Sequence, residues 1–551
     1  METDKACYQP GDTVKIRLTL ESPAGDGKIV VSYRHLNRII GKDTIDTGSA
    51  ARLTWNWFPP GTDFCGYLVE ASLQRKQEIA DQRTIAVDVS SDWKKFPRCG
   101  FLSRFSRLSP EHVDSVISNL SRFHINGLQF YDWHYKHHHP VKLIDGKPAA
   151  VWQDIGKREN HLRTIRNYIT GAHRRGMMTM AYNLLYGSWE DGPADGVSES
   201  WRLYRDQGHT QPAKIDFDQN WSSDIYLMNP ADPGWQKYIL GEMKKVFGTL
   251  DFDGWHIDQL GDWRPMWTSR GNPVKTDETF GVFLNAAHTT LNRPLVMNAV
   301  GQYGQRQIAS SPVEFLYSEV WDPDSTYADL VRIIENNYRL GSGRLQTILA
   351  AYVNQGLAEH PGEADPASVL LADAVIFAAG GAHLELGEHL LAHPYFPNAN
   401  LKMKNGLHDR LLKYYDFLVA YQNLLRGEVQ TDSALTLHSR SVQLSDTPVQ
   451  GKVWYYARKI PSRQIVHLVN FMGTATSNWR DNAGQQTLPQ PQKNTVIYFT
   501  AGRPVREVWL ASPDLANGLP QPLQFELRNG QTEIKIPELH IWDMIVIDYQ
   551  D

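Results

Sequence analysis

The stretch Asp253-Gly-Trp-His-Ile-Asp-Gln-Leu-Gly261 is typical of a buried strand that ends in a carboxylate. Alternation places His256 and Asp258 on one face and the intervening Trp and Ile on the other, where large apolar side chains suit packing beneath helices. A helix precedes this strand, because Asp232-Pro233 combines a capping acid with a proline suited to the first helical turn. A helix followed by a buried strand is the unit from which we predict the fold.

The same unit recurs on both sides of this stretch. Ser109-Pro110-Glu111 has the features of a helix start, and Asn126-Gly127 ends that helix before the next strand. Eight such strands within about 290 residues predict a (β/α)8 TIM barrel. A doubly wound sheet is the alternative, but the chain lacks the Gly-rich first turn that would support it. The predicted strands are 98–102, 128–132, 177–183, 254–258, 294–298, 314–319, 346–352 and 381–385.

Alternating β patterns flank the barrel on both sides. Before it, runs such as 13–20 predict an N-terminal β-sandwich, resembling an immunoglobulin domain, over residues 1–95. After a last helix, short β runs such as 464–470 predict an antiparallel β-sandwich over 428–551. We therefore expect a multidomain chain whose central barrel occupies 96–427.

The composition excludes several classes of protein. With 41% hydrophobic and 21% charged residues the chain is globular, and 61 acidic against 56 basic residues remove the electrostatic case for a nucleic-acid binder. No apolar run approaches the ~20 residues that span a bilayer. The polar start Met1-Glu-Thr-Asp-Lys5 does not resemble a signal peptide. A cytoplasmic protein and the mature form of an exported one both stay open, and we expect a secreted, periplasmic or cell-surface protein.

Aromatic residues are abundant, with 17 Trp and 24 Tyr in the chain. Sugar rings present flat apolar C–H faces that pack on such side chains, although packing between domains explains the richness equally well. Three cysteines, Cys7, Cys65 and Cys99, are too few and too widely spaced for a disulfide framework or a zinc site. We expect them to be isolated thiols.

Polar residues end most of the predicted barrel strands, and the active sites of such barrels lie at that end. Asp258 ends the fourth strand and Glu319 the sixth, so both carboxylates are expected at one barrel mouth. Retaining glycoside hydrolysis needs such a pair: one carboxylate attacks the anomeric carbon, and the other, its pKa raised, protonates the leaving oxygen. A salt-bridged loop acid is the alternative for either residue, and it is a weaker explanation for both together.

Three segments carry a family resemblance: Asn126-Gly-Leu-Gln-Phe-Tyr-Asp-Trp-His-Tyr-Lys-His-His-His-Pro140, Gly254-Trp-His-Ile-Asp-Gln259 and Tyr317-Ser-Glu-Val-Trp321. The chain resembles glycoside hydrolase family 66, which contains endo-dextranases and cycloisomaltooligosaccharide glucanotransferases. The resemblance implies that Asp258 is the nucleophile and Glu319 the acid/base. It also implies cleavage of the α-1,6-glucosidic links of dextran with retention of configuration.

Other residues at or just after strand ends are predicted to bind sugar. Asp132 would accept hydrogen bonds from hydroxyls, Trp133 would stack on a ring and His134 would donate. For the amides the alternative is a core amide, for the aromatic residues it is packing of loops, and for His383 and Glu385 it is a buried ion pair. The predicted substrate-binding set is Asp132, Trp133, His134, Asn183, Tyr186, His256, Gln259, Trp263, Asn298, Tyr317, Trp321, Tyr352, His383 and Glu385.

The segment 132–139 holds four histidines after an aspartate, a pattern that also occurs in metal-dependent hydrolases. Such sites need further ligands at later strand ends, and only His383 is available. We therefore expect no metal ion and no other cofactor. For His137, His138 and His139 a functional role and a loop-packing cluster stay equally open.

Two further readings of the function stay open. A cyclising glucanotransferase shares the glucosyl-enzyme intermediate, and the resemblance implies that such members carry an extra carbohydrate-binding module late in the barrel. Only about 40 residues follow His383 before the closing helix ends, too few for a module of that kind. A non-catalytic glucan-binding protein is the third reading. In every case we expect a monomer whose partner is an α-1,6-glucan such as dextran or an isomaltooligosaccharide.

Overall fold

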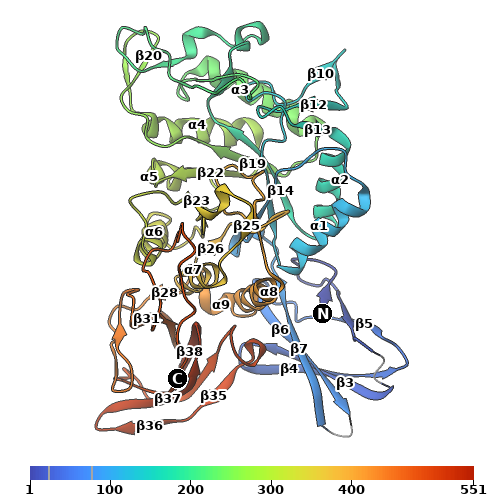
Figure 1. The fold of residues 1–551 in the computed structure, drawn as a ribbon, viewed down its shortest axis with the longest axis vertical. Helices are drawn as coiled ribbons and strands as arrows, with labels where there is room; N and C mark the ends of the chain where they lie inside the picture. Colours follow the sequence, from blue (N-terminus) through green and yellow to red (C-terminus); the bar gives the residue numbers. More distant parts are fainter. Residues whose placement is uncertain (23–24, 76–77, 551) are drawn as a thin grey trace.

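The computed structural model describes residues 1–22, 25–75 and 78–550, and its centre is a parallel sheet of eight strands that follow one another in chain order (Figure 1). The backbone N–H of Phe101 donates to the carbonyl of Leu386 at 3.1 Å, which links the first strand to the chain just after the eighth. The sheet is thus a nearly closed barrel, as predicted. Its strands are β8 (Cys99–Leu102), β9 (Gly127–Phe130), β14 (Met178–Leu184), β19 (Gly254–Asp258), β22 (Leu295–Val300), β23 (Leu316–Glu319), β24 (Thr347–Ala350) and β26 (Ala382–His383).

Several of the helices that alternate with these strands begin at capping residues, and the starts at Ser109 and Asp232 were predicted from the sequence. The Ser109 hydroxyl accepts from the His112 N–H, and Thr326 and Asp329 form a capping box. The helices are α1 (Pro110–Arg122), α2 (Leu162–His173), α3 (Pro233–Thr249), α4 (Thr276–Leu291), α5 (Gln305–Ala309), α6 (Tyr327–Leu340), α7 (Pro366–Ala378), α8 (Asn405–Ala420) and α9 (Gln422–Leu425).

Long excursions leave the barrel after its second, third and fourth strands and cover the carboxyl ends of the strands (Figure 1). Shorter ones follow β24 and β26. Their strands are β10 (Leu143–Ile144), β11 (Lys147–Pro148), β12 (Val151–Gln153), β13 (Glu159–His161), β15 (Gly187–Trp189), β16 (Leu203–Tyr204), β17 (Lys214–Ile215), β18 (Ile225–Leu227), β20 (Met266–Thr268), β21 (Pro273–Val274), β25 (Gly362–Glu363) and β27 (Leu401–Lys402).

Two antiparallel sheets precede the barrel and share an apolar core that includes Val14, Ile16, Val31 and Tyr67. Asp416 of α8 accepts from the backbone N–H of Ala86 at 2.9 Å, which fastens this part to the barrel. One sheet has the order β1-β2-β5 and the other β4-β3-β6-β7. Their bounds are β1 (Glu2–Thr3), β2 (Val14–Thr19), β3 (Gly25–His35), β4 (Arg38–Gly48), β5 (Arg52–Trp57), β6 (Cys65–Arg75) and β7 (Glu78–Val89).

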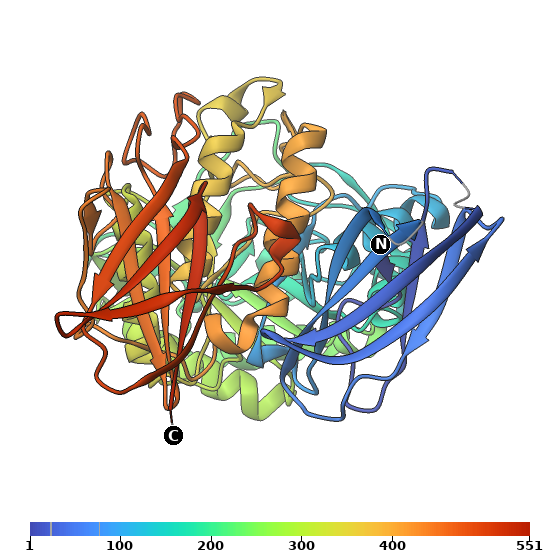
Figure 2. The same cartoon turned by 90° about the horizontal axis from the view of Figure 1, so that it is seen from below.

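Two more antiparallel sheets follow the barrel and enclose Leu468, Ile497, Ile536 and Ile547. Figure 2 shows them and the N-terminal sheets on opposite sides of α8. One sheet has the order β28-β31-β32-β38-β34-β35 with β30 beside β31, and the other β29-β33-β37-β36. Their bounds are β28 (Gln430–Thr431), β29 (Leu437–Ser439), β30 (Leu444–Ser445), β31 (Val453–Ile460), β32 (Arg463–Asn470), β33 (Gln492–Phe499), β34 (Val505–Ala511), β35 (Gln521–Leu523), β36 (Phe525–Arg528), β37 (Gln531–Leu539) and β38 (Trp542–Tyr549).

The changes of element type suggest domain limits. A short 3-10 helix, Trp93–Lys95, precedes β8, and α9 ends before the C-terminal sheets begin. We propose the limits 1–95, 96–427 and 428–551 on this ground. Within the described residues no helix has the length and apolarity needed to cross a membrane. Cys7, Cys65 and Cys99 are free thiols and all three are buried.

Candidate active site

A pocket of about 410 Å³ lies at the carboxyl ends of the barrel strands. It contains both predicted carboxylates, Asp258 and Glu319, and the predicted residues Asp132, Gln259 and Trp321. A larger hollow of about 1020 Å³ lies between the N-terminal strands, α1 and α8, but it contains none of the predicted site residues. The remaining residues of the smaller pocket are Tyr131, His137, Ile155, Tyr182, Leu184, Ile215, Phe217, Trp221, Ile225, Leu260 and Val300.

Asn298, near the carboxyl end of β22, joins the two carboxylates. Its Nδ2 donates to Asp258 Oδ1 at 2.8 Å and to Glu319 Oε2 at 2.9 Å. In the sheet, β22 lies between β19, which ends in Asp258, and β23, which ends in Glu319. Because neighbouring parallel strands end at the same edge, the three side chains meet there.

Each carboxylate has further donors of its own. Asp258 accepts from the Tyr182 hydroxyl and from the backbone N–H of Gln259, both at 2.8 Å. Glu319 accepts from the Tyr352 hydroxyl at 2.7 Å. Glu319 also accepts from the Trp321 side chain, so each acid has three donors that favour its charged form.

The pKa values of the two acids follow from burial and from their mutual repulsion. Burial raises the pKa of Asp258, and the hydrogen bonds from Asn298 and Tyr182 oppose that rise. Burial and then the charge of Asp258 raise the pKa of Glu319 to about 7. The pair thus favours an ionised Asp258 beside a Glu319 that holds its proton near neutral pH.

Asp132 lies at the same mouth, two residues after the end of β9, and has a positive φ of 51°. Its side chain is almost fully buried, and burial raises its pKa to about 7 despite the nearby Arg158 guanidinium. Arg158 is 3.4 Å from Asp132 and 2.8 Å from Asp154. Asp132 is therefore a pocket residue whose protonation state depends on its surroundings. A carboxyl group in this position is a candidate for binding a sugar hydroxyl.

Beneath the carboxylates the barrel interior is filled by predicted residues that lie deeper than the pocket. The rings of His256 and Tyr317 are in edge contact, with centroids 4.7 Å apart, and both are almost fully buried. Tyr352 packs against Trp321, with centroids 5.8 Å apart, and reaches Glu319 with its hydroxyl. His256, Tyr317 and Tyr352 do not line the pocket, and a sugar contact from any of them stays a prediction.

Several residues that line the pocket were not predicted from the sequence. Tyr182 donates to Asp258, yet the neighbouring Asn183 was predicted for this strand. The alternation that places His256 on the inner face applies to β14 as well, and Tyr182 is paired with His256 across the two strands. Applying it to both strands would have found Tyr182.

An aromatic wall was also missed, because it comes from the excursion after β14. Phe217 and Trp221 are stacked, with centroids 4.6 Å apart, and Tyr395 meets Trp221 edge-on at 5.7 Å. Phe217 and Trp221 line the pocket. No periodicity in the sequence predicts such residues, because they lie in a loop whose position depends on tertiary contacts.

Burial contradicts the predicted sugar contacts of Trp133, Asn183 and Tyr186, whereas Trp263 is partly exposed but does not line the pocket. Trp133 is fully buried, donates to the carbonyl of Tyr182 and packs on Phe252, so it has no free face for stacking. Asn183 is fully buried and donates to the carbonyl of His137. Tyr186 accepts from the Leu260 N–H, and Trp263 donates to the carbonyl of Leu260. Tyr186, which is almost fully buried, and the partly exposed Trp263 thus shape the loop after β19 and do not line the pocket.

The predictions for His383 and Glu385 are also wrong. His383 Nδ1 lies 2.8 Å from Asp373 Oδ1, and Nε2 lies 2.8 Å from the carbonyl of Ala351. The Tyr415 hydroxyl donates to Glu385 at 3.0 Å. Helices α7 and α8 cover this cluster, and His383 Nδ1 lies 3.5 Å from Glu385, which agrees with the stated alternative of a buried ion pair.

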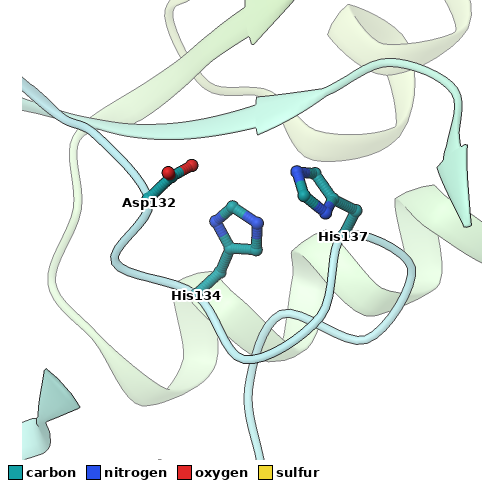
Figure 3. Close-up of side chains that lie close together, drawn as sticks. All are labelled: Asp132, His134 and His137. Carbon is teal, nitrogen blue, oxygen red and sulfur yellow. The ribbon is translucent and has the colours of Figure 1, made fainter. Parts of the chain in front are cut away.

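His134 and His137 lie beside Asp132 (Figure 3), and the three offer ligand atoms within 4.8 Å of one another. The Trp189 indole N–H donates to His137 Nδ1 at 3.0 Å, which leaves the proton of the neutral ring on Nε2. His137 therefore has no free lone pair for a metal ion. His134 is fully buried and does not line the pocket, and among the described residues neither of its ring nitrogens has a hydrogen-bond partner, so its donation to a sugar stays a prediction.

Two further groups of possible metal ligands are occupied by protein donors. Lys136 Nζ lies 2.6 Å from Asp191 and 2.7 Å from Asp195, where a cation would otherwise sit. His138 accepts from the Trp189 backbone N–H and lies 2.9 Å from Asp195. The third group is Asp373, His383 and Glu385, in which both histidine nitrogens are already bonded.

Comparisons with known proteins identify the family of the chain. The profile of glycosyl hydrolase family 66 matches residues 3–546. A cycloisomaltooligosaccharide glucanotransferase of Niallia circulans is 27% identical over 700 residues, which covers 98% of this chain and 71% of the relative. A dextranase of Streptococcus salivarius is 26% identical over 609 residues, covering 94% of this chain and 72% of the relative.

Solved structures give the same result for the fold. A cycloisomaltooligosaccharide glucanotransferase of Paenibacillus sp., in complex with cycloisomaltoheptaose, superposes with a TM-score of 0.93 at 25% identity and covers 99% of both chains. An α-amylase of Geobacillus thermoleovorans shares the fold more distantly, with a TM-score of 0.51 at 12% identity over 83% of this chain and 99% of that one. Since the family profile spans nearly the whole chain, the protein belongs to glycosyl hydrolase family 66.

Proposed function

We propose that the protein is a retaining glycosidase that hydrolyses internal α-1,6-glucosidic linkages of dextran through a covalent glucosyl-enzyme intermediate. The observation that carries this proposal is the position of Asn298, whose Nδ2 donates to both Asp258 and Glu319. Two oxygens that are hydrogen-bonded to the same nitrogen cannot lie farther apart than the sum of the two N···O distances. That limit is below the ~6.5 Å at which inverting pairs begin, and it supports a retaining pair.

In the first step, a carboxylate oxygen of Asp258 attacks the anomeric carbon while Glu319 gives its proton to the glycosidic oxygen. The C–O bond to the leaving sugar breaks as the ester to Asp258 forms. In the second step, water attacks the anomeric carbon, Glu319 takes the proton of that water, and the ester bond breaks to restore the Asp258 carboxylate. In each step one bond to the anomeric carbon forms as another breaks, and the numbers of protons and electrons balance.

The change of role at Glu319 follows from electrostatics. Before reaction, burial and the charge on Asp258 together raise the pKa of Glu319, so that Glu319 is protonated near neutral pH. Esterification removes that charge, and the pKa of Glu319 falls. The same side chain can then act as the base toward water, with Tyr352 still donating to it.

The substrate class comes from the relatives and is supported by the pocket. One relative is named a dextranase, and another was solved with cycloisomaltoheptaose. Phe217, Trp221 and Trp321 line the pocket and provide apolar faces suited to glucose rings, while Asp132 provides an acceptor for hydroxyls. A polymeric substrate of this kind favours an exported enzyme, which we propose with it.

A cyclising glucanotransferase is the second candidate, favoured by the superposition with the Paenibacillus enzyme. Its intermediate is the same, but a hydroxyl of the bound chain replaces water as the acceptor. The alignment with the Niallia transferase spans 700 positions, more than the 551 residues present here, so that relative has segments that this chain lacks. The short connection 384–404 between β26 and α8 agrees with such a difference, and we therefore place hydrolysis first.

Product analysis from dextran separates the candidates. Hydrolysis yields linear isomaltooligosaccharides and one new reducing end for each bond cleaved, whereas cyclisation yields rings without reducing ends. The reaction is followed by a reducing-sugar assay together with chromatography, and the Glu319→Gln variant serves as the control. Rings as the main early product would reject hydrolysis, and binding of dextran without any product would reject both enzymes in favour of a glucan-binding protein.

A further inference from the structure

The C-terminal sheets reach the active site through residues 471–491, the loop that connects β32 to β33. The Trp479 indole N–H donates to the carbonyl of Asp324 at 2.8 Å, and Asn478 pairs with Thr326 as an isolated antiparallel bridge. Asp324 and Thr326 belong to the segment that follows Glu319. This loop is therefore packed directly against the chain that leaves the sixth barrel strand.

One residue of the loop, Arg480, holds two barrel segments at once. Its guanidinium donates to the carbonyl of Val320 at 3.1 Å, and its own carbonyl accepts from the backbone N–H of Asn354 at 2.6 Å. Val320 follows Glu319 directly, and Asn354 lies two residues after Tyr352. Arg480 thus ties together the two segments whose side chains form the Tyr352–Glu319 hydrogen bond.

The same guanidinium also fixes an aromatic side of the pocket. It lies 5.3 Å from the centroid of the Trp321 ring and 4.8 Å from that of Trp479. Arg480 is 5% exposed, so this cation is largely shielded from water, where contact with ring faces is most favourable. Because Trp321 lines the pocket, a change at Arg480 is transmitted to its wall.

We infer that Arg480, supplied by the C-terminal β-module, is a positioning residue for the acid/base carboxylate, an inference that rests on the proposed hydrolysis. It acts through the carbonyl of Val320, the N–H of Asn354 and the ring of Trp321. Without these contacts the two strand ends can shift apart, and a misplacement of about 1 Å at a reacting group costs on the order of 100-fold in rate.

The test compares Arg480→Met with Arg458→Met. Arg458 is a matched control, because it is a buried arginine of the same β-module that donates to the carbonyl of Leu425 in α9 and to that of Val429. It lies outside the pocket. Both variants lose a buried guanidinium, so both are expected to melt at a lower temperature than the parent.

Below both melting temperatures we expect Arg480→Met to lower kcat on dextran by about 10- to 100-fold, with KM changed by less than about threefold. Loss of the cation should also move the alkaline limb of the pH profile to higher pH, since a nearby positive charge favours ionised Glu319. Arg458→Met should retain kcat within about twofold. Equal losses of kcat in the two variants, or an unchanged kcat and alkaline limb in Arg480→Met, would overturn the inference.

Arg480→Lys keeps the charge but not the planar fork, and it should recover the alkaline limb without recovering all of kcat. This variant also decides the outcome if Arg480→Met does not fold. A crystal structure of either Arg480 variant gives a readout that needs no activity, namely the distance between the Tyr352 hydroxyl and Glu319, which is 2.7 Å in the parent. If the parent does not act on dextran, the proposed function fails. An unchanged distance in both variants would reject the positioning role by itself.

Discussion

Glu319 and Glu385 belong to the same barrel, and each accepts a hydrogen bond from a tyrosine hydroxyl. Tyr352 donates to Glu319 at 2.7 Å and Tyr415 to Glu385 at 3.0 Å, and burial raises the pKa of both carboxyl groups. Their surroundings differ. Glu319 faces a pocket that holds a second carboxylate, whereas Glu385 is 1% exposed and enclosed with the His383 side chain.

The comparison shows that an acid at a strand end is not sufficient for an active site. Helix α7 is buried along its length between the barrel and the C-terminal sheets, and it supplies Asp373 to the cluster of His383 and Glu385. No substrate atom can reach a group closed off in this way. A raised pKa therefore marks a candidate only where the group also has access to a pocket.

The largest expected effect separates the two glutamates. Glu319→Gln and Asp258→Ala should each lower kcat on dextran by about 10³-fold or more, because each removes a reacting group. Glu385→Gln should stay within about threefold of the parent. Steady-state rates of folded variants provide the measurement. If Glu385→Gln is as inactive as Glu319→Gln, the distinction between an accessible Glu319 and an enclosed Glu385 is wrong.

A second variant at Glu319 sharpens the assignment of its role. Glu319→Ala should harm dextran far more than an activated aryl glucoside, whose leaving group needs no proton, and azide should restore the rate with retention of configuration. Equal losses on both substrates without rescue would point to a structural Glu319 and to another acid, such as Asp132.

The next effect tests the amide that joins the carboxylates. Asn298→Ala removes one donor to Asp258 and one to Glu319, and we expect kcat to fall about 100-fold. Asn183→Ala is the control, because Asn183 is a buried strand-end amide that donates only to the His137 carbonyl within the described residues. Similar kinetics for the two variants would mean that Asn298 is also a structural amide.

The pH dependence follows from the pKa of Glu319, which is raised to about 7. Glu319 must be protonated to act as the acid, so kcat should fall about tenfold per pH unit above its apparent pKa. The two acids are close enough to titrate as a pair, and the limb reports an apparent value. Asp132 is also raised to about 7, so Asp132→Asn is measured beside the parent. Loss of the alkaline limb in that variant would assign it to Asp132.

The smallest effect concerns stability at the enclosed cluster. Burial raises the pKa of Asp373 from 3.8 to about 8. Its contribution to stability is therefore complete below pH 4 and is lost as the pH rises through about 8, because the folded state holds a proton that the unfolded state releases. Asp373→Asn cannot release a proton. As the pH rises from 5 to 8, the melting temperature of Asp373→Asn should rise by about 1–3 °C relative to that of the parent. Calorimetry at each pH measures this difference. A difference that stays constant with pH would contradict the raised pKa of Asp373.

Much of the fold could be predicted from the sequence, because local signals and the fold agree. The capping residues Ser109 and Asp232 mark helix starts, and all eight predicted strands appear in the barrel sheet. The strand-end residues Asp258 and Glu319 share one pocket for the same reason, since parallel strands in chain order end at one mouth. Their chemical roles stay predictions until the variants are measured.

Other residues could not be assigned in this way. Trp133 and Asn183 have the chemistry of sugar-binding residues, but the chain folds back over both and buries them completely. Phe217 and Trp221 line the pocket although they lie far from any barrel strand in sequence. Exposure and long-range contact depend on which loops cover a position, and no local pattern encodes that.

The sequence by itself therefore determined the order of strands, the helix starts and the edge at which the acids meet, because hydrophobic periodicity and capping act over a few residues. Only the tertiary structure decided which acids stay accessible. It sealed Glu385 beneath α7 and α8, left Glu319 open beside Asn298, and placed Arg480 of the C-terminal sheets behind it. Access and support depend on packing between segments that are remote in the chain, and packing of that kind is a property of the whole fold.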